Sequence, residues 1–187
     1  MAAASLLRSL GPTYRYWKPI QTGPDNDSET VIELSGVTRE QILSNAYSFS
    51  AGLSPHLAAK REGKQIERAN LNLPDFSNLI VEGAGGLLVP FSDDVLQIDL
   101  IVEWKLPVLL VAKDRLGAIN HTLLSLEACR EKEIPVLGIL LNQGTEDFGN
   151  FETLKHWAKC PVWMVPYSPN PMELFQAAGI ELHLCHD

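Results

Sequence analysis

Residues 79–90 read LIVEGAGGLLVP, an apolar run followed directly by a glutamate and a glycine-rich loop. The three residues Leu79–Val81 are typical of a short buried strand. Glu82 then lies at the tip of that strand, beside backbone that glycine leaves free to approach a ligand closely. A carboxylate next to such a loop suits a magnesium-bound phosphate group. A plain glycine turn with a surface glutamate fits the same residues, and the loop alone does not decide between the two.

Other apolar runs of strand length lie on both sides of this loop, with helical patterns between them. The expected strands are 14–20, 79–81, 108–112, 136–141 and 162–165, and the expected helices include 96–104, a stretch through 119–126, and 151–158. This alternation predicts an α/β fold with a doubly wound, mostly parallel sheet flanked by helices. For the polar, turn-rich segment 22–74, the sequence pattern does not decide the secondary structure. Residues 2–10 fit either an ordinary helix ended by Gly11 and Pro12 or the start of an organelle-targeting peptide.

Composition limits the class of protein. With 187 residues, 45% of them hydrophobic, the chain has the size of a single domain, and we expect one domain over residues 1–187. The formal net charge of -8 argues against a nucleic-acid partner and favours a small ligand. No apolar run approaches the roughly 20 residues of a membrane-spanning helix. The three cysteines have no metal-like spacing and read as thiols of a reducing compartment, so we expect a cytoplasmic protein.

Polar residues follow each expected strand. Because ligands of doubly wound sheets bind beyond the carboxyl ends of the strands, these residues should converge on one site. They are Lys18 and Thr22, Glu82, Lys113 and Asp114, Asn142, and Tyr167 and Ser168. The histidines have no zincin spacing and no serine lies in a nucleophile elbow, so neither a zinc hydrolase nor a serine hydrolase is supported.

Several of the candidates have a plain structural interpretation as well. Lys18 follows an apolar run and can reach an anion, although most lysines are merely solvated. Asp27 and Glu29 precede a possible helix, where acidic residues are expected simply as caps and dipole partners. The Ser-Pro-His turn at 54–56 fits a substrate contact or a helix start in which Ser54 is the cap.

Five motifs together point to one family. They are YWKPIQTG at 16–23, LSPHLAAKREGKQI at 53–66, VEGAGGLLVP at 81–90, LGAINHTLLS at 116–125 and LLNQG at 140–144. In this order and spacing they resemble dethiobiotin synthetase, the ATP-dependent cyclo-ligase of biotin synthesis, over nearly the whole chain. The resemblance implies a homodimeric, P-loop-type enzyme that carboxylates 7,8-diaminopelargonate with carbon dioxide, phosphorylates the carbamate with ATP and closes the ureido ring. It also implies a requirement for Mg²⁺.

The same resemblance implies roles for individual residues. Lys18 matches the lysine that contacts the transferred phosphate and the carbamate, a role that suits charge stabilisation in phosphoryl transfer. The implied magnesium ligands are Glu82 and Asp27, with Glu29 as the alternative to Asp27. The implied substrate contacts are Thr22, Ser54, His56, Gly117, Ala118, Ile119 and Asn120. The implied nucleotide contacts are Glu82, Gly83, Ala84, Gly85, Gly86, the adenine-reading Asn142, and Pro166 and Tyr167 beside the base.

One family feature is not found in the sequence. The family begins with a strand and a Walker A phosphate loop ending in Gly-Lys-Thr, whereas the pair Gly63-Lys64 is followed by Gln65 and has Ala58 in place of the first glycine. We therefore expect a dethiobiotin synthetase that is incomplete at its N-terminus, with weakened ATP binding and a tendency to aggregate. The alternative is a non-catalytic homologue that retains only substrate binding or dimer contacts. The presence of Lys18, Glu82 and Asn142 favours the enzyme.

Overall fold

The computed structural model describes residues 2–165, which fall into two compact units. The N-terminal unit runs from Met1 to Lys105, and the C-terminal unit runs from Leu106 to Asp187. Each unit has its own parallel strands, its own helices and its own core. The single domain expected over residues 1–187 stays a prediction.

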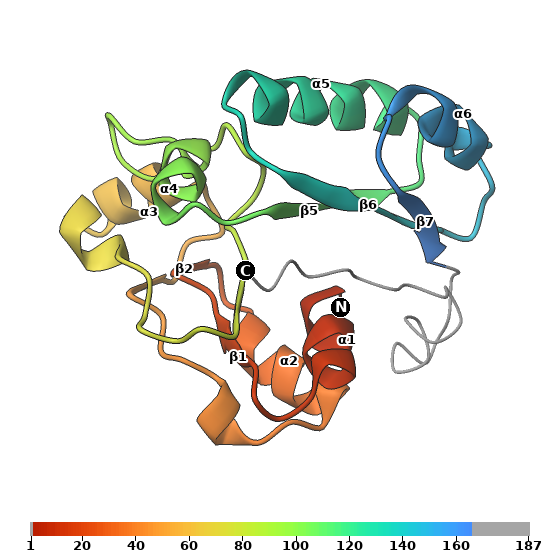
Figure 1. Ribbon diagram of the computed structural model, residues 1–187. Coiled ribbons are helices and arrows are strands. Elements are labelled where there is room, and N and C mark those ends of the chain that lie inside the picture. Colours follow the sequence, from red (N-terminus) through yellow and green to blue (C-terminus); the bar gives the residue numbers. More distant parts are fainter. Residues whose placement is uncertain (1, 166–187) are drawn as a thin grey trace. The chain divides into compact units, whose positions relative to one another are not determined.

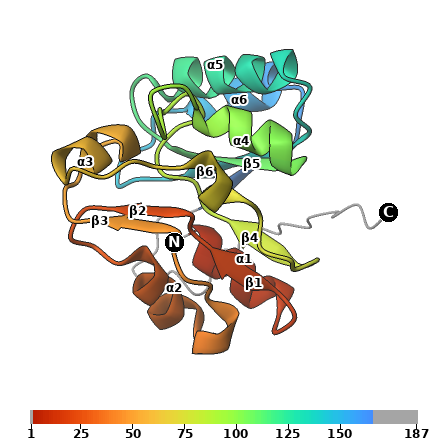
Figure 2. The ribbon, with the colours of Figure 1, turned by 90° about the vertical axis from the view of Figure 1, so that its left-hand side faces the viewer.

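The N-terminal unit contains two small parallel sheets. Its elements are α1 (Ala2–Leu10), β1 (Arg15–Trp17), β2 (Ile20–Thr22), α2 (Asp27–Ser35), β3 (Tyr47–Phe49), α3 (Pro55–Arg61), β4 (Leu79–Val81) and α4 (Gln97–Trp104), with short 3-10 helices at Arg39–Gln41 and Arg68–Leu71. Strand β1 pairs with β4, and β2 pairs with β3, both in parallel. Figure 2 shows the two pairs of neighbouring strands.

The expected strand 14–20 is broken in two at Lys18 and Pro19. Proline has no N–H to donate to a strand ladder, so pairing is interrupted there. The carbonyl group of Pro19 instead accepts hydrogen bonds from the backbone amides of Ala46, at 2.8 Å, and Tyr47, at 3.1 Å. The break lets the chain leave β4 and pair with β3, and it leaves Lys18 at the carboxyl end of β1.

Helix α1 forms where the sequence predicts an ordinary helix, and it ends at Leu10, before Gly11 and Pro12. It packs against α2 in the same unit (Figure 1). Leu7, Tyr16 and Val31 are buried in the core that these elements share. A second core in this unit lies around Ile20, Phe49, Ala58, Phe91 and Leu100.

The C-terminal unit has one parallel sheet in the order β5-β6-β7. Its elements are β5 (Val108–Lys113), α5 (Ala118–Glu131), β6 (Val136–Asn142), α6 (Asn150–Trp157) and β7 (Val162–Val165). Helices α5 and α6 lie on the same side of this sheet (Figure 1). Leu126, Ile139 and Ala158 form the core between the helices and the sheet. A side chain at Gly138 would overlap the ring of Trp163, which explains the glycine in the middle of β6.

The predicted α/β class with parallel strands is confirmed, because each pairing between named strands in residues 2–165 is parallel. Strand β3 lies in the segment 22–74 that the sequence left open. Within the described residues, no helix has the length and apolar character needed to cross a membrane.

Candidate functional site

A buried lysine joins two carboxylates at the carboxyl ends of β1 and β4. Lys18 is only 7% exposed, and its ammonium group contacts Oδ2 of Asp27 and lies 3.3 Å from Oε1 of Glu82. A buried charge is strongly destabilising unless opposite charges and hydrogen bonds compensate it. The two carboxylates provide this compensation, so three residues singled out in the sequence lie in one charged cluster, called the Lys18 cluster below.

A tyrosine completes the cluster from the core side. The hydroxyl group of Tyr16 donates a hydrogen bond to Oε2 of Glu82 at 3.0 Å, and the tyrosine itself is fully buried. Burial, and then the negative charge of Glu82, raise the pKa of Tyr16 well above its usual range. Tyr16 therefore stays protonated and remains a donor to the carboxylate. Sequence analysis missed this residue, because an aromatic side chain in an apolar run reads simply as core.

The two acidic candidates at the start of α2 have different surroundings. The cap of this helix is Asn26, whose side chain accepts a hydrogen bond from the backbone amide of Glu29 at 3.2 Å. The carboxylate of Glu29 pairs with Arg39, whereas that of Asp27 contacts Lys18. Capping by a neighbouring asparagine leaves the Asp27 carboxylate available to the cluster. Asp27, and not Glu29, is therefore the second carboxylate that lies beside Lys18 together with Glu82.

The glycine loop after Glu82 is held in place by a glutamine from α4. Oε1 of Gln97 accepts a hydrogen bond from the amide of Ala84 at 2.7 Å, and Nε2 donates to the carbonyl group of Gly86 at 3.2 Å. A Cβ atom at Gly83 would overlap the Gln97 side chain, so glycine is required for this close approach. Gln97 is 5% exposed and was not singled out from the sequence. The loop is therefore fixed by a buried side chain.

A cavity of about 400 Å³ opens beside the Lys18 cluster within the N-terminal unit. It is lined by Lys18, Thr22, Asp27, Leu53, Ser54, Pro55, Ala84, Gly85 and Val89. Ser54 does precede α3, with Pro55 at the first helical position, but its side chain makes no capping hydrogen bond. His56 is not among the lining residues, and its Nδ1 lies 3.2 Å from the carbonyl oxygen of Pro90. The structure thus brings most of the candidates of this unit to one cavity.

The donor set of the cluster fits a magnesium ion that is bound together with a nucleotide. One or two carboxylates are enough for such an ion, because phosphate oxygens and waters provide the remaining ligands. Asp27 and Glu82 both reach the same ammonium group, so their oxygens already face a single cation. No group of three or more His, Cys, Asp or Glu side chains suited to a metal occurs within residues 2–165.

The polar residues of the C-terminal unit are arranged differently. Asp114 is 1% exposed, and its Oδ1 accepts a hydrogen bond from Nδ2 of Asn150 at 2.6 Å. Nδ2 of Asn150 also donates to the carbonyl group of Arg115 at 3.0 Å. The amide of Asp114 donates to the carbonyl group of Asn142 at 2.7 Å, which places the ends of β5 and β6 side by side. Within the described residues, this buried carboxylate is held by a neutral amide rather than by a cation.

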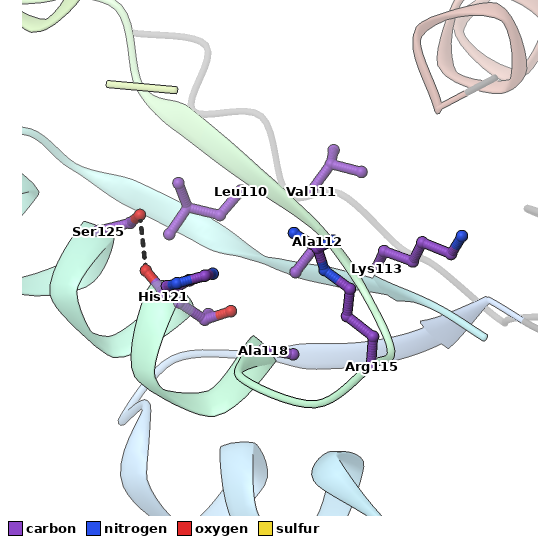
Figure 3. Close-up of a pocket in the computed structure, with 9 residues that line it drawn as sticks. Leu110, Val111, Ala112, Lys113, Arg115, Ala118, His121 and Ser125 are labelled. Atoms are coloured by element: carbon purple, nitrogen blue, oxygen red, sulfur yellow. Dashed lines mark hydrogen bonds between the residues drawn. The ribbon is translucent and has the colours of Figure 1, made fainter. Parts of the chain in front are cut away.

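A second, smaller cavity of about 210 Å³ lies between β5 and α5. In Figure 3, Leu110 borders it from the strand, while His121 and Ser125 border it from the helix. Ala118 and Arg115 stand near the turn that joins the two elements (Figure 3). Of the four predicted substrate contacts at the start of α5, Ala118 lines this cavity and Gly117 is the left-handed cap of the helix. Ile119 and Asn120 lie in the first turn.

Comparisons with known proteins show the family to which the chain belongs. A family model described as an AAA domain matches residues 1–172. The ATP-dependent dethiobiotin synthetases of Brucella abortus (strain S19), Brucella ovis and Brucella canis are each 44% identical to the chain over 149 residues. The matched region covers 78% of this chain and 69% of each relative. The chain belongs to the ATP-dependent dethiobiotin synthetase family.

Membership of the dethiobiotin synthetase family confirms the resemblance drawn from the five motifs, and the AAA-domain match agrees with a P-loop NTPase-like α/β fold. The pair Gly63-Lys64 follows the carboxyl end of α3, and Lys64 pairs with Glu62 at 2.8 Å. No α-helix begins directly after this pair, as one does after a phosphate loop, and the next helical element is the short 3-10 helix Arg68–Leu71. Of the candidate nucleotide contacts, Pro166 and Tyr167 lie outside the described residues.

Proposed function

We propose that the chain closes the ureido ring of dethiobiotin from 7,8-diaminopelargonate and carbon dioxide, using ATP and Mg²⁺. As a member of the dethiobiotin synthetase family, it is an ATP-dependent ligase of biotin synthesis. The observation that carries the proposed mechanism is the Lys18 cluster, in which a buried ammonium group contacts two carboxylates beside a cavity. The residue roles below rest on this cluster.

The proposed reaction has three steps. One amine of the substrate attacks carbon dioxide and forms a carbamate. The carbamate oxygen then takes the γ-phosphoryl group of ATP, and ADP leaves. Finally the second amine attacks the carbonyl carbon of the carbamic-phosphoric anhydride, and inorganic phosphate leaves as the ring closes. The last two steps involve negatively charged phosphoryl groups, first in their transfer from ATP and then in the release of phosphate. The site must therefore provide fixed positive charge.

Lys18 is the group proposed to stabilise that charge. It lies at the edge of the 400 Å³ cavity, and its ammonium group is held by Asp27 and Glu82. A preorganised charge in a site of low water content stabilises a transition state more effectively than a solvated one. Lys18 is therefore proposed to bind the transferred phosphoryl group and the carbamate.

Asp27 and Glu82 are proposed to hold Mg²⁺, which neutralises charge on the nucleotide phosphates when bound. Glu29 is the less favoured choice because its carboxylate pairs with Arg39. The residues of the loop from Gly83 to Gly86 are proposed to lie against the phosphates, since Gln97 fixes that loop beside Glu82.

The roles of the remaining candidate residues are proposed from where they lie in the fold. Thr22 and Ser54 line the N-terminal cavity and are proposed to contact the diamine, with His56 close by on α3. Asn142, at the end of β6, is proposed to read adenine. The start of α5 is proposed to take the substrate carboxylate across a homodimer interface, because helix amides and the helix dipole favour an anion. The enzyme is proposed to act in the cytoplasm.

The test is formation of dethiobiotin from diaminopelargonate by the full chain, with ATP, Mg²⁺ and bicarbonate present. Lys18→Ala should lower kcat by about 100-fold or more, as removal of one transition-state charge partner does in other enzymes. Lys60→Ala is the matched control, because Lys60 is an exposed lysine in the last turn of α3. The activity of this variant should equal that of the wild type. Absence of turnover in the wild type, with diaminopelargonate still bound, would instead support the non-catalytic homologue.

A further inference from the structure

Tyr16 is a buried polar group that the proposed mechanism does not yet use. It is fully buried in β1, in the core that includes Leu7, Val31 and the partly buried Ile80. A buried tyrosine hydroxyl group needs a partner, because leaving it unpaired in apolar surroundings is costly. Its acceptor is Oε2 of Glu82, 66 residues away in the sequence and 3.0 Å away in space.

The strand register explains why Tyr16 and Lys18 meet the same glutamate. Tyr16 pairs with Ile80 and Trp17 pairs with Val81 in the parallel ladder. The amide of Glu82 donates to the carbonyl group of Trp17 at 2.9 Å, so the alignment continues past the end of β4. Side chains two residues apart project from the same face of a strand, which puts Tyr16 and Lys18 on one face together with Glu82.

The two oxygens of Glu82 therefore have different partners. Oε2 accepts from the hydroxyl group of Tyr16 on the core side, and Oε1 lies 3.3 Å from the ammonium group of Lys18. A hydrogen bond to one oxygen fixes the rotation of the carboxylate about its terminal bond, whose preference is otherwise broad. With Oε2 engaged, Oε1 is the oxygen presented to a cation.

We propose that Tyr16 is a positioning residue, whose hydroxyl group holds Glu82 so that Oε1 faces the cation site. The proposal rests on the proposed function, since it takes Glu82 as a magnesium ligand. Hydrogen-bonding partners of metal ligands commonly contribute about 10–100-fold to metal affinity, and Tyr16 has the geometry of such a partner. It does not contact substrate or phosphate in this role.

The test is binding of Mn²⁺, as a substitute for Mg²⁺, to the full chain in the presence of ATP. The amount of free Mn²⁺ is followed by electron paramagnetic resonance, and the same titration without protein corrects for the metal bound by ATP alone. Tyr16→Phe removes only the hydroxyl group and should weaken the protein-dependent Mn²⁺ affinity by about 10–100-fold. Circular dichroism checks that the variant is folded. If Tyr16→Phe does not fold, Tyr16→Met removes the same hydroxyl group with a side chain that adapts to the space.

The matched control is Tyr47→Phe. The Tyr47 hydroxyl group accepts hydrogen bonds from the amide of Glu67, at 2.9 Å, and from Nδ2 of Asn70, at 2.8 Å, so its loss tests a purely structural role. Tyr47→Phe should lower the melting temperature and leave Mn²⁺ affinity unchanged. Wild-type affinity in the folded Tyr16 variant, with weakened binding in Glu82→Gln, would overturn the positioning role alone. Unchanged affinity in Glu82→Gln as well would overturn the metal site of the proposed function.

Discussion

The two units each place a carboxylate near the end of a parallel strand, half-buried at Glu82 and fully buried at Asp114, but they compensate it in different ways. In the N-terminal unit, Glu82 lies beside the ammonium group of Lys18 and the hydroxyl group of Tyr16. In the C-terminal unit, Asp114 accepts a hydrogen bond from the neutral amide of Asn150. A carboxylate paired with a cationic side chain can exchange that partner for a metal ion or share it with a phosphate. A carboxylate tied to an amide at the start of a helix instead fixes the backbone. We therefore expect a chemical role for Glu82 and a structural role for Asp114.

The largest expected effects come from changing one side chain in each unit, Glu82 in the first and Asn150 in the second. Glu82→Gln should lower kcat for dethiobiotin formation by about 100-fold or more, since it removes a proposed ligand of the metal that stabilises transition-state charge. Asn150→Ala should instead lower the free energy of unfolding by about 1–3 kcal/mol, because it leaves Oδ1 of a buried carboxylate without its donor. Steady-state kinetics and urea denaturation measure the two effects.

Asn72→Ala serves as the control for the asparagine variant, because Nδ2 of Asn72 makes a local hydrogen bond to the carbonyl group of Ala69 at 2.8 Å, and the residue is exposed. Its stability should stay close to that of the wild type. If Glu82→Gln proved the less stable variant and Asn150→Ala the less active one, the assignment of roles to the two units would be reversed.

A smaller effect is expected from the glycine loop. Gly83→Ala puts a Cβ atom into the side chain of Gln97 and should destabilise the N-terminal unit by about 1–3 kcal/mol through overpacking. Gly86→Ala is the control in the same loop, because a Cβ atom there meets nothing within 4 Å. Thermal unfolding of the two variants compares them directly. Equal melting temperatures would show that Gln97 does not constrain this loop.

The smallest effect concerns an exposed pair in the N-terminal unit. The hydrogen bond from Lys64, together with those from the amide and hydroxyl groups of Ser50, lowers the pKa of Glu62 to about 2. Because the folded-state pKa lies below the unfolded one, the ionised Glu62 contributes stability above the unfolded pKa of about 4.3. That contribution is lost as the pH falls from there to about 2. Glu62→Gln should therefore reduce the acid dependence of unfolding in this range, and Lys64→Met should do so in part. An unchanged pH profile in both variants would contradict the pairing.

Much of the fold follows from sequence pattern. Helix α1 before Gly11-Pro12 and the short strand ahead of Glu82 were predicted from local residues alone. The strand β3 was not, since Tyr47–Phe49 has only three residues inside a polar, turn-rich segment. The break at Pro19 was also missed, because the run from 14 to 20 reads as a single apolar strand.

The candidate site also contains both residues that the sequence indicates and residues that it does not. Lys18 and Glu82 stand out because charged residues follow apolar runs, and the sheet register then brings them together. Gln97 and Tyr16 do not stand out, since a polar residue at a helix start and an aromatic residue in a strand have ordinary structural explanations. Their importance arises from contacts with residues far away in the sequence. Only the folded chain reveals such pairs.

We propose that the Lys18 cluster is the metal and phosphate site. Its most direct test is a crystal structure of the full chain with Mn²⁺ and a non-hydrolysable ATP analogue, in which anomalous scattering locates the metal. We expect a Mn²⁺ peak coordinated by Asp27 and Glu82, with the ammonium group of Lys18 turned to the terminal phosphate. A metal bound to the nucleotide but to neither carboxylate would contradict it.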